Sequence, residues 1–294
     1  MAASRTAQYV ALYRALETYE NRRPPLFRDP YARGFLSRFQ ALAIGASRAP
    51  FLRGLLERYS DRRSPGSRTS AIARTAYIDD AVRAAVATGI DQVVILGAGF
   101  DCRAHRMPEL RGIAVFEVDR ADTQAAKRGR LPDTAGAPDA QRVHYVAVDF
   151  LRDEVGAKLE AAGWEPRRRS LFVWEGVTGY LTEPAVASVL RWISTTATGS
   201  SVVFTYLHGG LLDGTVQFLG GERLLENVRR LGEPWTFGLH PEAVDAFVAR
   251  CGLRLRENLG ADDYRRRYLG DGALPGYAFY RVAIAQVTGA ERGA

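Results

Sequence analysis

The stretch VVILGAGFDCRAHR, residues 93–106, decides the fold class of this chain of 294 residues. Four apolar residues run directly into Gly-Ala-Gly, and charged residues follow at once. A buried strand that ends in a glycine turn is typical of nucleotide-binding α/β proteins, because glycine lets the backbone approach a ligand closely. The alternative interpretation is a tight turn without a ligand, since glycine also serves any sharp change of backbone direction.

From residue 91 onward, short apolar runs alternate with helical stretches. Strands are expected, in chain order, at residues 92–96, 113–118, 143–148, 170–174 and 201–206. Helices are expected between them, at residues 122–131, 153–163 and 183–194. This alternation predicts an α/β fold with a mostly parallel sheet and helices on both faces. The last part of the chain is expected to form a helix at 240–252 and strands at 253–258 and 277–287, and an antiparallel final strand fits that order.

The regions outside this alternation are expected to cover the sheet. Residues 1–90 have a helical pattern and are expected to form a cap, and residues 91–294 form the core of the same integrated domain. Within the cap, we expect a helix at 6–20, a proline break at 23–30, a loop at 64–70 and a long helix at 71–89. Residues 211–237 are longer than an ordinary connection and are expected to lie as an insertion over the mouth of the sheet.

The formal net charge of +7 comes almost entirely from arginine, because Lys127 and Lys158 are the only lysines. Basic proteins often bind nucleic acids or acidic small molecules. The densest basic runs, residues 167–169 and 265–267, lack the interleaved aromatic side chains of a nucleic-acid platform. Solvated surface is therefore the preferred interpretation of these runs, with anion binding as the alternative, and no nucleic-acid partner is expected.

The rest of the composition bounds the class of protein. No apolar run approaches the roughly 20 residues that span a bilayer, and the first ten residues contain no apolar signal segment. The two cysteines, Cys102 and Cys251, form neither a disulfide framework nor a metal cluster, and the histidines show no metal-ligand spacing. We therefore expect a cytoplasmic protein without a membrane partner and without a metal.

The residues of the glycine turn favour one cofactor over another. A dinucleotide turn needs a third glycine at the start of the next helix, where the pyrophosphate rests, and that glycine is missing here. Asp101 would also place a negative charge beside the pyrophosphate. S-adenosylmethionine carries a sulfonium and an ammonium instead, so Gly97, Ala98, Gly99 and Asp101 are predicted to line a site for its cationic end.

Acidic residues follow three successive predicted strands. Glu117 and Asp119 end the second strand, where a carboxylate can accept ribose hydroxyls from either cofactor. Asp149 and Phe150 follow the third strand and suit an adenine, and Glu175 follows the fourth and suits the cofactor's ammonium. Each acid alone is more often a helix cap or a surface residue. Because the carboxyl ends of parallel strands meet at one edge, we expect the acids to face one crevice.

These motifs resemble the leucine carboxyl methyltransferase-like, or PPM-type, class I S-adenosylmethionine-dependent methyltransferases, which include bacterial polyketide O-methyltransferases of secondary metabolism. The matching pieces run in family order: TAQYVALYRALE, DPYA, ARTAYIDD, QVVILGAGFDCRAHR, FEVDRADTQAAKR, VAVDF, FVWEGVTGYLTEPAV and FGLHPEAVDAF. The resemblance implies a Rossmann-like sheet of seven strands, one of them antiparallel. It also implies that S-adenosylmethionine is the cofactor.

The resemblance further implies individual roles. Arg74 would bind the cofactor's carboxylate, and Tyr180 would lie near the transferred methyl group. The other cofactor contacts would come from Gly97, Gly99, Asp119, Asp149 and Glu175. Gly179 departs from the family pattern, because relatives often carry a larger residue there, and this leaves the shape of the local pocket open.

Three hypotheses for the activity follow. The first is methylation of a carboxylate on a small molecule or peptide, with Arg103 or Arg106 orienting the acid and no strong base required. The second is methylation of a natural-product hydroxyl, which needs a base, with His208 as the candidate and Tyr180 as a weaker one. The third is a non-catalytic scaffold that binds S-adenosylmethionine. The sequence predicts no particular acceptor and no oligomeric state.

Overall fold

A computed structural model of the chain describes residues 5–132, 143–150 and 152–289. It contains one seven-stranded sheet in the order β3-β2-β1-β4-β5-β7-β6. The strands are β1 (Gln92–Leu96), β2 (Ala114–Asp119), β3 (Val143–Ala147), β4 (Ser170–Trp174), β5 (Ser201–Leu207), β6 (Arg254–Leu259) and β7 (Tyr280–Gln286). The first five strands pair in parallel, whereas β7 runs antiparallel to both β5 and β6. The predicted mostly parallel sheet with an antiparallel final strand is therefore confirmed.

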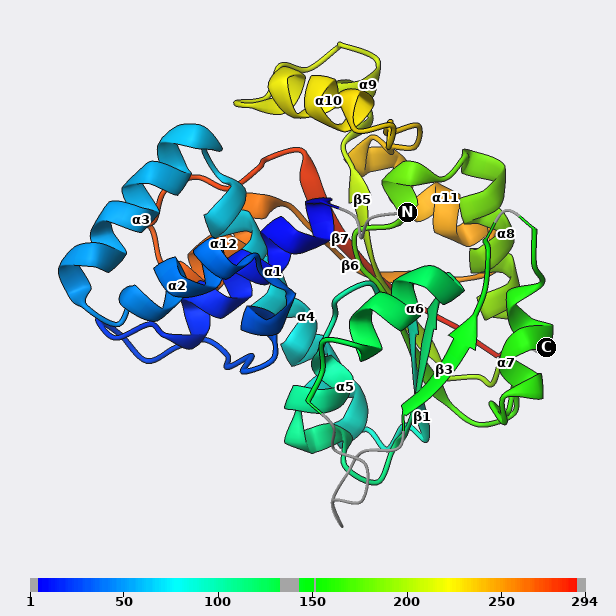
Figure 1. The fold of residues 1–294 in the computed structure, drawn as a ribbon. Coiled ribbons are helices and arrows are strands. Elements are labelled where there is room, and N and C mark those ends of the chain that lie inside the picture. Colours follow the sequence, from blue (N-terminus) through cyan, green and yellow to red (C-terminus); the bar gives the residue numbers. More distant parts are fainter. Residues whose placement is uncertain (1–4, 133–142, 151, 290–294) are drawn as a thin grey trace.

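Helices cover both faces of this sheet (Figure 1). The helices that follow β1 in the chain are α5 (Arg103–Arg106), α6 (Ala121–Arg128), α7 (Val155–Ala161), α8 (Glu183–Ser194), α9 (Gly209–Leu212), α10 (Gly221–Arg230), α11 (Val244–Arg250) and α12 (Ala261–Leu269). Those on one face, α7, α8 and α11, bury their apolar sides against the sheet in one cluster. Helix α12 and the N-terminal α4 (Ser67–Ala87) pack on the opposite face.

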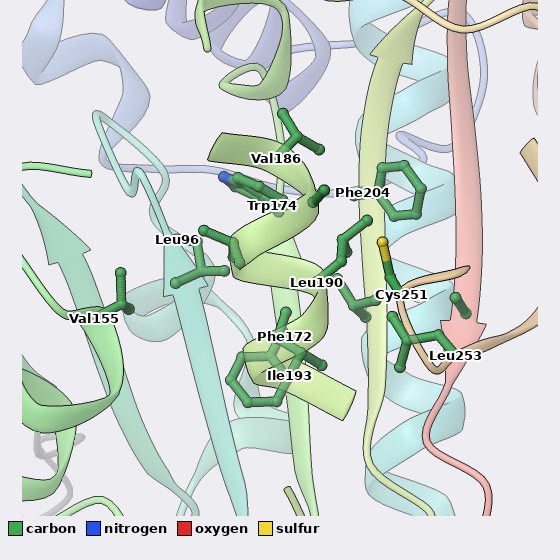
Figure 2. Close-up of a cluster of buried hydrophobic side chains, with 14 of the residues drawn as sticks. Leu96, Val155, Phe172, Trp174, Val186, Leu190, Ile193, Phe204, Cys251 and Leu253 are labelled. Carbon is green, nitrogen blue, oxygen red and sulfur yellow. The ribbon is translucent and has the colours of Figure 1, made fainter. Parts of the chain in front are cut away.

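The larger cluster lies between the sheet and the helices α7, α8 and α11 (Figure 2). Trp174 at the end of β4 is fully buried in it, and so are Phe172 of the same strand and Phe204 of the neighbouring β5. Cys251 also lies among these side chains and is 3% exposed. A buried free thiol packs like a small hydrophobic residue, so this cysteine is a core residue.

The N-terminal region forms helices α1 (Arg5–Thr18), α2 (Arg38–Ala46), α3 (Pro50–Arg63) and α4. Helix α1 packs against α4, and α2 and α3 lie farther from the sheet (Figure 1). Helix α4 itself shares a cluster with β1, so its residues belong to the helical layer of the sheet. Among the described helices, none combines the length and the apolar character needed to cross a membrane.

Most predicted elements lie close to the observed ones, and two differences are informative. The loop expected at 64–70 ends early, because α4 begins at Ser67 directly after Gly66, whose φ is +86°. Helix α12 was not predicted, although Ala261, Tyr264 and Tyr268 in its sequence ADDYRRRYL recur at helical spacing and face one core cluster. The inserted segment 211–237 contains helix α10, which lies beyond the end of β5 (Figure 1).

Candidate functional site

The glycine turn after β1 requires two glycines for different reasons. Gly97 has a φ of +66°, and a Cβ at this position would lie 2.3 Å from Cγ2 of Val177. Any other residue would therefore meet both backbone strain and a steric clash. Gly99 has a φ of +45°, and its N–H donates to Oδ2 of Asp119 at 2.6 Å. The turn that follows β1 is thus tied to the end of β2.

A pocket opens directly at this turn. It contains about 660 Å³ of empty space, part of it open to solvent. Its lining comes from the carboxyl ends of β1 and β4, the start of β7 and helix α1, and it includes Arg14, Arg74, Gly97, Ala98, Gly99, Asp101, Glu175, Tyr180 and Tyr280. The carboxyl edge of a parallel sheet is where ligands bind in doubly wound folds. Of the predicted cofactor residues, the structure therefore brings Arg74, the glycine turn, Asp101 and Glu175 together.

Arg74 is buried yet keeps hydrogen-bonding capacity toward the pocket. Its Nε donates to Oε1 of Glu175 at 2.8 Å, and its guanidinium carbon lies 4.4 Å from the ring centroid of Tyr280. Within residues 5–132, 143–150 and 152–289, its two terminal nitrogens have no hydrogen-bond partner. Two parallel N–H groups on a guanidinium match the two oxygens of a carboxylate. Arg74 is thus suited to bind an anionic ligand group.

Arg103 and Arg106 lie beneath the pocket. Arg103 donates to Asp79 at 2.8 Å, to Glu175 at 2.9 Å and also to Asp101. Arg106 forms a bidentate pair with Asp79 at 2.6 and 2.7 Å. Both arginines are almost completely buried, and neither lines the pocket. The arrangement therefore speaks against the expectation that they orient an acceptor, because their N–H groups already serve buried carboxylates.

Two pocket carboxylates remain ionised because of these arginines. Burial alone would raise the pKa of Glu175, but the charges of Arg103 and Arg74 outweigh it and lower that pKa. Burial opposes ionisation of Asp101 too, and Arg103, Arg14 and Lys127 together hold its pKa well below the usual range. Both groups are therefore anionic at neutral pH and weak as proton acceptors.

Asp119 behaves differently. Its carboxylate accepts from the backbone N–H of Gly99 and, at 2.7 Å, from that of Arg120. Burial nevertheless raises its pKa above the ordinary value for an aspartate. Each of its oxygens has a second lone pair, so the group can accept further hydrogen bonds from neighbouring hydroxyls.

Four predicted cofactor residues do not line the pocket, and Asp119 is one of them. Glu117 points into the core and pairs with Lys127 at 2.6 Å, with both side chains 1% exposed. Phe150 packs on the core near Trp174, at 6.4 Å between ring centroids. Asp149 lies after β3, and its side chain is about two-fifths exposed. Glu117 thus acts as a structural ion pair, and sequence reasoning did not separate it from Asp119 because both end the same strand.

The two predicted catalytic residues have different surroundings. Tyr180 lines the pocket, which fits the expectation that it lies near the transferred methyl group. His208 lies outside the pocket lining, and its Nδ1 accepts a hydrogen bond from the N–H of Gly210 at 3.1 Å. Burial and the neighbouring His240 lower its pKa. Because the lone pair of Nδ1 already accepts this backbone N–H, His208 is poorly placed to accept a proton from a substrate.

Sequence reasoning missed several residues of this region. Asp79 is fully buried and binds both Arg103 and Arg106, and the signal was the first Asp of the apolar helix segment AYIDD. Tyr280 gave no signal, because it starts an ordinary-looking strand. The described residues contain no group of three or more His, Cys, Asp or Glu arranged to hold a metal ion.

The strand order and the pocket at the carboxyl edge define a Rossmann-like fold of the class I methyltransferase type. The profile described as leucine carboxyl methyltransferase matches residues 7–194. The chain belongs to the leucine carboxyl methyltransferase family.

Relatives from two actinobacteria agree with this assignment. The chain is similar to proteins from Frankia alni and Streptomyces avermitilis, each named a "Putative S-adenosyl-L-methionine-dependent methyltransferase", at 36% and 37% identity. Both alignments cover 71% of this chain and 70% of the relative.

Solved structures agree in fold. A "duf574 family protein" from Streptomyces avermitilis has a TM-score of 0.58 at 15% identity, over 97% of each chain. A "putative methyltransferase" from Thermobifida fusca has a TM-score of 0.56 at 19% identity, over 81% of this chain and 89% of its own. At these identities the likeness concerns the fold.

Proposed function

We propose that this chain is an O-methyltransferase that moves a methyl group from S-adenosylmethionine to a carboxylate of a small molecule or peptide. The methyltransferase class and the cofactor follow from the family and from the names of the relatives. The choice of a carboxylate rests on the chemistry of the pocket.

The pocket residues fit S-adenosylmethionine. Arg74 would bind its carboxylate and Glu175 would lie near its ammonium, and both line the pocket. Asp119 lies outside the lining but accepts a hydrogen bond from Gly99 of the glycine turn, and it would accept the ribose hydroxyls. The glycine turn fits an unphosphorylated ligand, because Asp101 lies in the pocket lining and would repel a pyrophosphate. A Cβ at Gly97 would clash with Val177, so only glycine fits this turn. The backbone of Gly97 lines the pocket and would lie against the ligand.

The observation that favours a carboxylate acceptor is the absence of a poised base among the described pocket residues. Asp101 and Glu175 are ion-paired and have lowered pKa values. Burial raises the pKa of Tyr280, and His208 uses its lone pair as a cap. A hydroxyl acceptor must lose a proton, whereas a carboxylate arrives ionised at neutral pH. This pocket therefore suits an acceptor that brings its own negative charge.

When bound, S-adenosylmethionine would supply a methyl group on a sulfonium sulfur. The acceptor oxygen would bond to the methyl carbon, and the sulfur would leave as the thioether of S-adenosylhomocysteine. The protein's part is to bind and align. Arg74 and Glu175 hold one end of the cofactor, and Tyr180, beside Glu175 on the loop after β4, faces the acceptor. Alignment of two bound reactants alone can contribute roughly 7–11 kcal/mol to a rate enhancement. We assign Tyr180 to hydrogen bonding with the acceptor oxygen.

The test compares matched acids and alcohols. The protein is incubated with methyl-labelled S-adenosylmethionine and cinnamate, cinnamyl alcohol, nonanoate or nonanol, and label in each product is counted before and after mild alkali. Only methyl esters release volatile methanol under alkali. We expect label in the acids, loss of that label in alkali, and unchanged turnover in His208→Asn, which keeps a capping group.

Alkali-stable label in the alcohols, lost in His208→Asn, would instead support hydroxyl methylation. Binding of S-adenosylhomocysteine without label transfer to any acid or alcohol, including a small-molecule extract, would favour the scaffold hypothesis. A melting-temperature shift with S-adenosylhomocysteine is the control for a functional cofactor site.

A further inference from the structure

The outer part of the pocket is built from aromatic rings. Tyr180, after β4, and Tyr280, at the start of β7, both line it. Trp235, from the segment between α10 and α11, packs against both tyrosines, at 6.4 Å from the Tyr180 ring centroid and 6.5 Å from that of Tyr280. The indole plane makes angles of 61° and 74° with the two tyrosine rings. The two tyrosines thus line one side of the pocket, and Trp235 packs against both of them from outside the lining; we name these three residues the aromatic corner.

Trp235 is held in this place because the next residue, Thr236, bonds to η3 (Thr178–Tyr180) and to the residue that follows it. The N–H of Thr236 donates to the carbonyl of Gly179 at 2.7 Å, and the Thr236 hydroxyl donates to the carbonyl of Leu181 at 2.9 Å. These bonds fix the neighbouring tryptophan relative to Tyr180. A fixed aromatic wall loses little conformational entropy when a ligand binds.

Gly179 makes the close approach of Trp235 possible. A Cβ at position 179 would lie 3.3 Å from Cδ1 of Trp235 and 3.0 Å from Cδ1 of Leu207. Both distances are tighter than ordinary contacts, so a larger residue would push the indole outward. The glycine and the tryptophan therefore act as a pair that sets the width of the aromatic corner.

From these contacts we propose that the aromatic corner is the acceptor subsite and that it selects acceptors with a flat, conjugated ring system next to the reacting carboxylate. The inference rests on the proposed function, since it concerns the acceptor of that same site. Aromatic side chains favour offset or edge-to-face contact with other rings over contact with flexible alkyl chains. Tyr280 lies against Arg74, which pairs with Glu175, and this pair is proposed to hold the methionine end of the cofactor, so an acceptor ring against the tyrosines would lie next to that end of the cofactor.

The test uses two acids with the same number of carbons. Cinnamate is flat and conjugated, whereas nonanoate is flexible and has more apolar hydrogens to remove from water. Binding of each to the intact protein is measured by calorimetry with S-adenosylhomocysteine present. Simple apolar burial favours nonanoate, whereas ring contacts favour cinnamate. We expect cinnamate to bind about 10-fold more tightly, a preference that corresponds to about 1.4 kcal/mol.

Variants assign the preference to the corner. Trp235→Ala should weaken the binding of cinnamate about 5- to 10-fold, in line with the strength of aromatic pairs, and should change the affinity for nonanoate by less than about twofold. Gly179→Ala should reduce the same preference by moving the indole. The matched control is Phe218→Ala, which removes an aromatic ring of the same inserted segment that packs on His208 and Phe279. It should leave both affinities unchanged.

The outcomes are distinguishable. Equal or tighter binding of nonanoate, or no binding of either acid while S-adenosylhomocysteine still stabilises the protein, would overturn the subsite. An equal loss of affinity for both acids in Trp235→Ala would also overturn the subsite, because the residue would then act through folding. If S-adenosylhomocysteine itself fails to stabilise the wild type, the proposed function has failed rather than the subsite.

Discussion

The two sides of the pocket are built by opposite means. The inner side is ionic: Arg74, Asp79, Asp101, Arg103 and Glu175 form a buried network in which each carboxylate has at least one guanidinium partner. The outer side is the aromatic corner, with no ion pair between its rings. In the proposed function, the inner side would bind a fixed chemical group by charge, whereas the outer side would recognise shape. This difference predicts that inner substitutions change folding and cofactor binding, and outer ones change acceptor choice.

Arg103→Ala should have the largest effect. It would leave Asp79, Asp101 and Glu175 without a shared partner in a buried place, and removing one member of a buried ion pair costs about 3–5 kcal/mol of unfolding free energy. Urea denaturation measures this loss. The matched control is Arg83→Ala, whose side chain is 40% exposed and pairs with Asp80 and Glu109. It should cost less than about 1 kcal/mol. Similar losses in both variants would contradict the structural role of the ionic side.

Arg74→Ala should mainly affect the ligand. Its terminal nitrogens are the ones left for an anionic group, and a hydrogen bond to a charged partner contributes about 1.5–3 kcal/mol. We therefore expect S-adenosylhomocysteine to bind roughly 10- to 100-fold more weakly, as measured by calorimetry. Arg74→Lys should recover part of the affinity, because one charge remains but the fork is lost. Unchanged binding in Arg74→Ala would remove the residue from the cofactor site.

Gly97→Ala should have an intermediate effect, because it changes both the stability of the protein and the binding of the cofactor. The added Cβ meets Cγ2 of Val177, and the alanine must keep the positive φ of the glycine. Together these changes should lower the free energy of unfolding by about 1–3 kcal/mol. The melting temperature should fall, and cofactor binding should weaken with it. The double variant Gly97→Ala/Val177→Ala removes the clash but keeps the strained backbone. Partial rescue is the expected result, and full rescue would mean that backbone strain contributes nothing.

The smallest expected effect is a pH dependence. Glu175 has a lowered pKa, so the stability it supplies is present above its unfolded value of 4.5 and is lost only as the pH falls through its lower folded value. Asp119 has a raised pKa, so it takes up its proton first on acidification. Binding of S-adenosylhomocysteine should therefore weaken with falling pH before the protein destabilises, by at most about 10-fold per pH unit. Asp119→Asn should flatten this dependence.

The predictability of the two sides from sequence also differs. The strands β1 and β4 were predicted with their observed bounds, because a buried parallel strand is a continuous apolar run followed by a turn. The residues at those strand ends, Gly97 and Glu175, could be found for the same reason. Arg103 looked like an acceptor ligand, since a sequence does not reveal that Asp79, 24 positions earlier, consumes its N–H groups.

Tyr180 was predicted as a site residue, but its grouping with Trp235 and Tyr280 in the aromatic corner was not. Its members are separated by 45 to 55 positions along the chain, from Tyr180 to Trp235 and on to Tyr280. They meet only because the inserted segment folds back to Gly179 and because β7 enters the sheet beside β5. Neither contact leaves a periodic pattern. The departure at Gly179 was the one local signal, and its meaning depends on a tryptophan far away.

The pairing of β7 with β5 has a consequence for synthesis. Residues 201–207 leave the ribosome long before their partners at 280–286. At about 5–20 residues per second, the free edge of β5 stays without this neighbour for roughly 4 to 15 seconds. An unpaired strand edge invites association with other chains during that time. Tyr280 also belongs to the late strand, so a nascent chain acquires its glycine turn first and gains a finished pocket only when its last strand arrives.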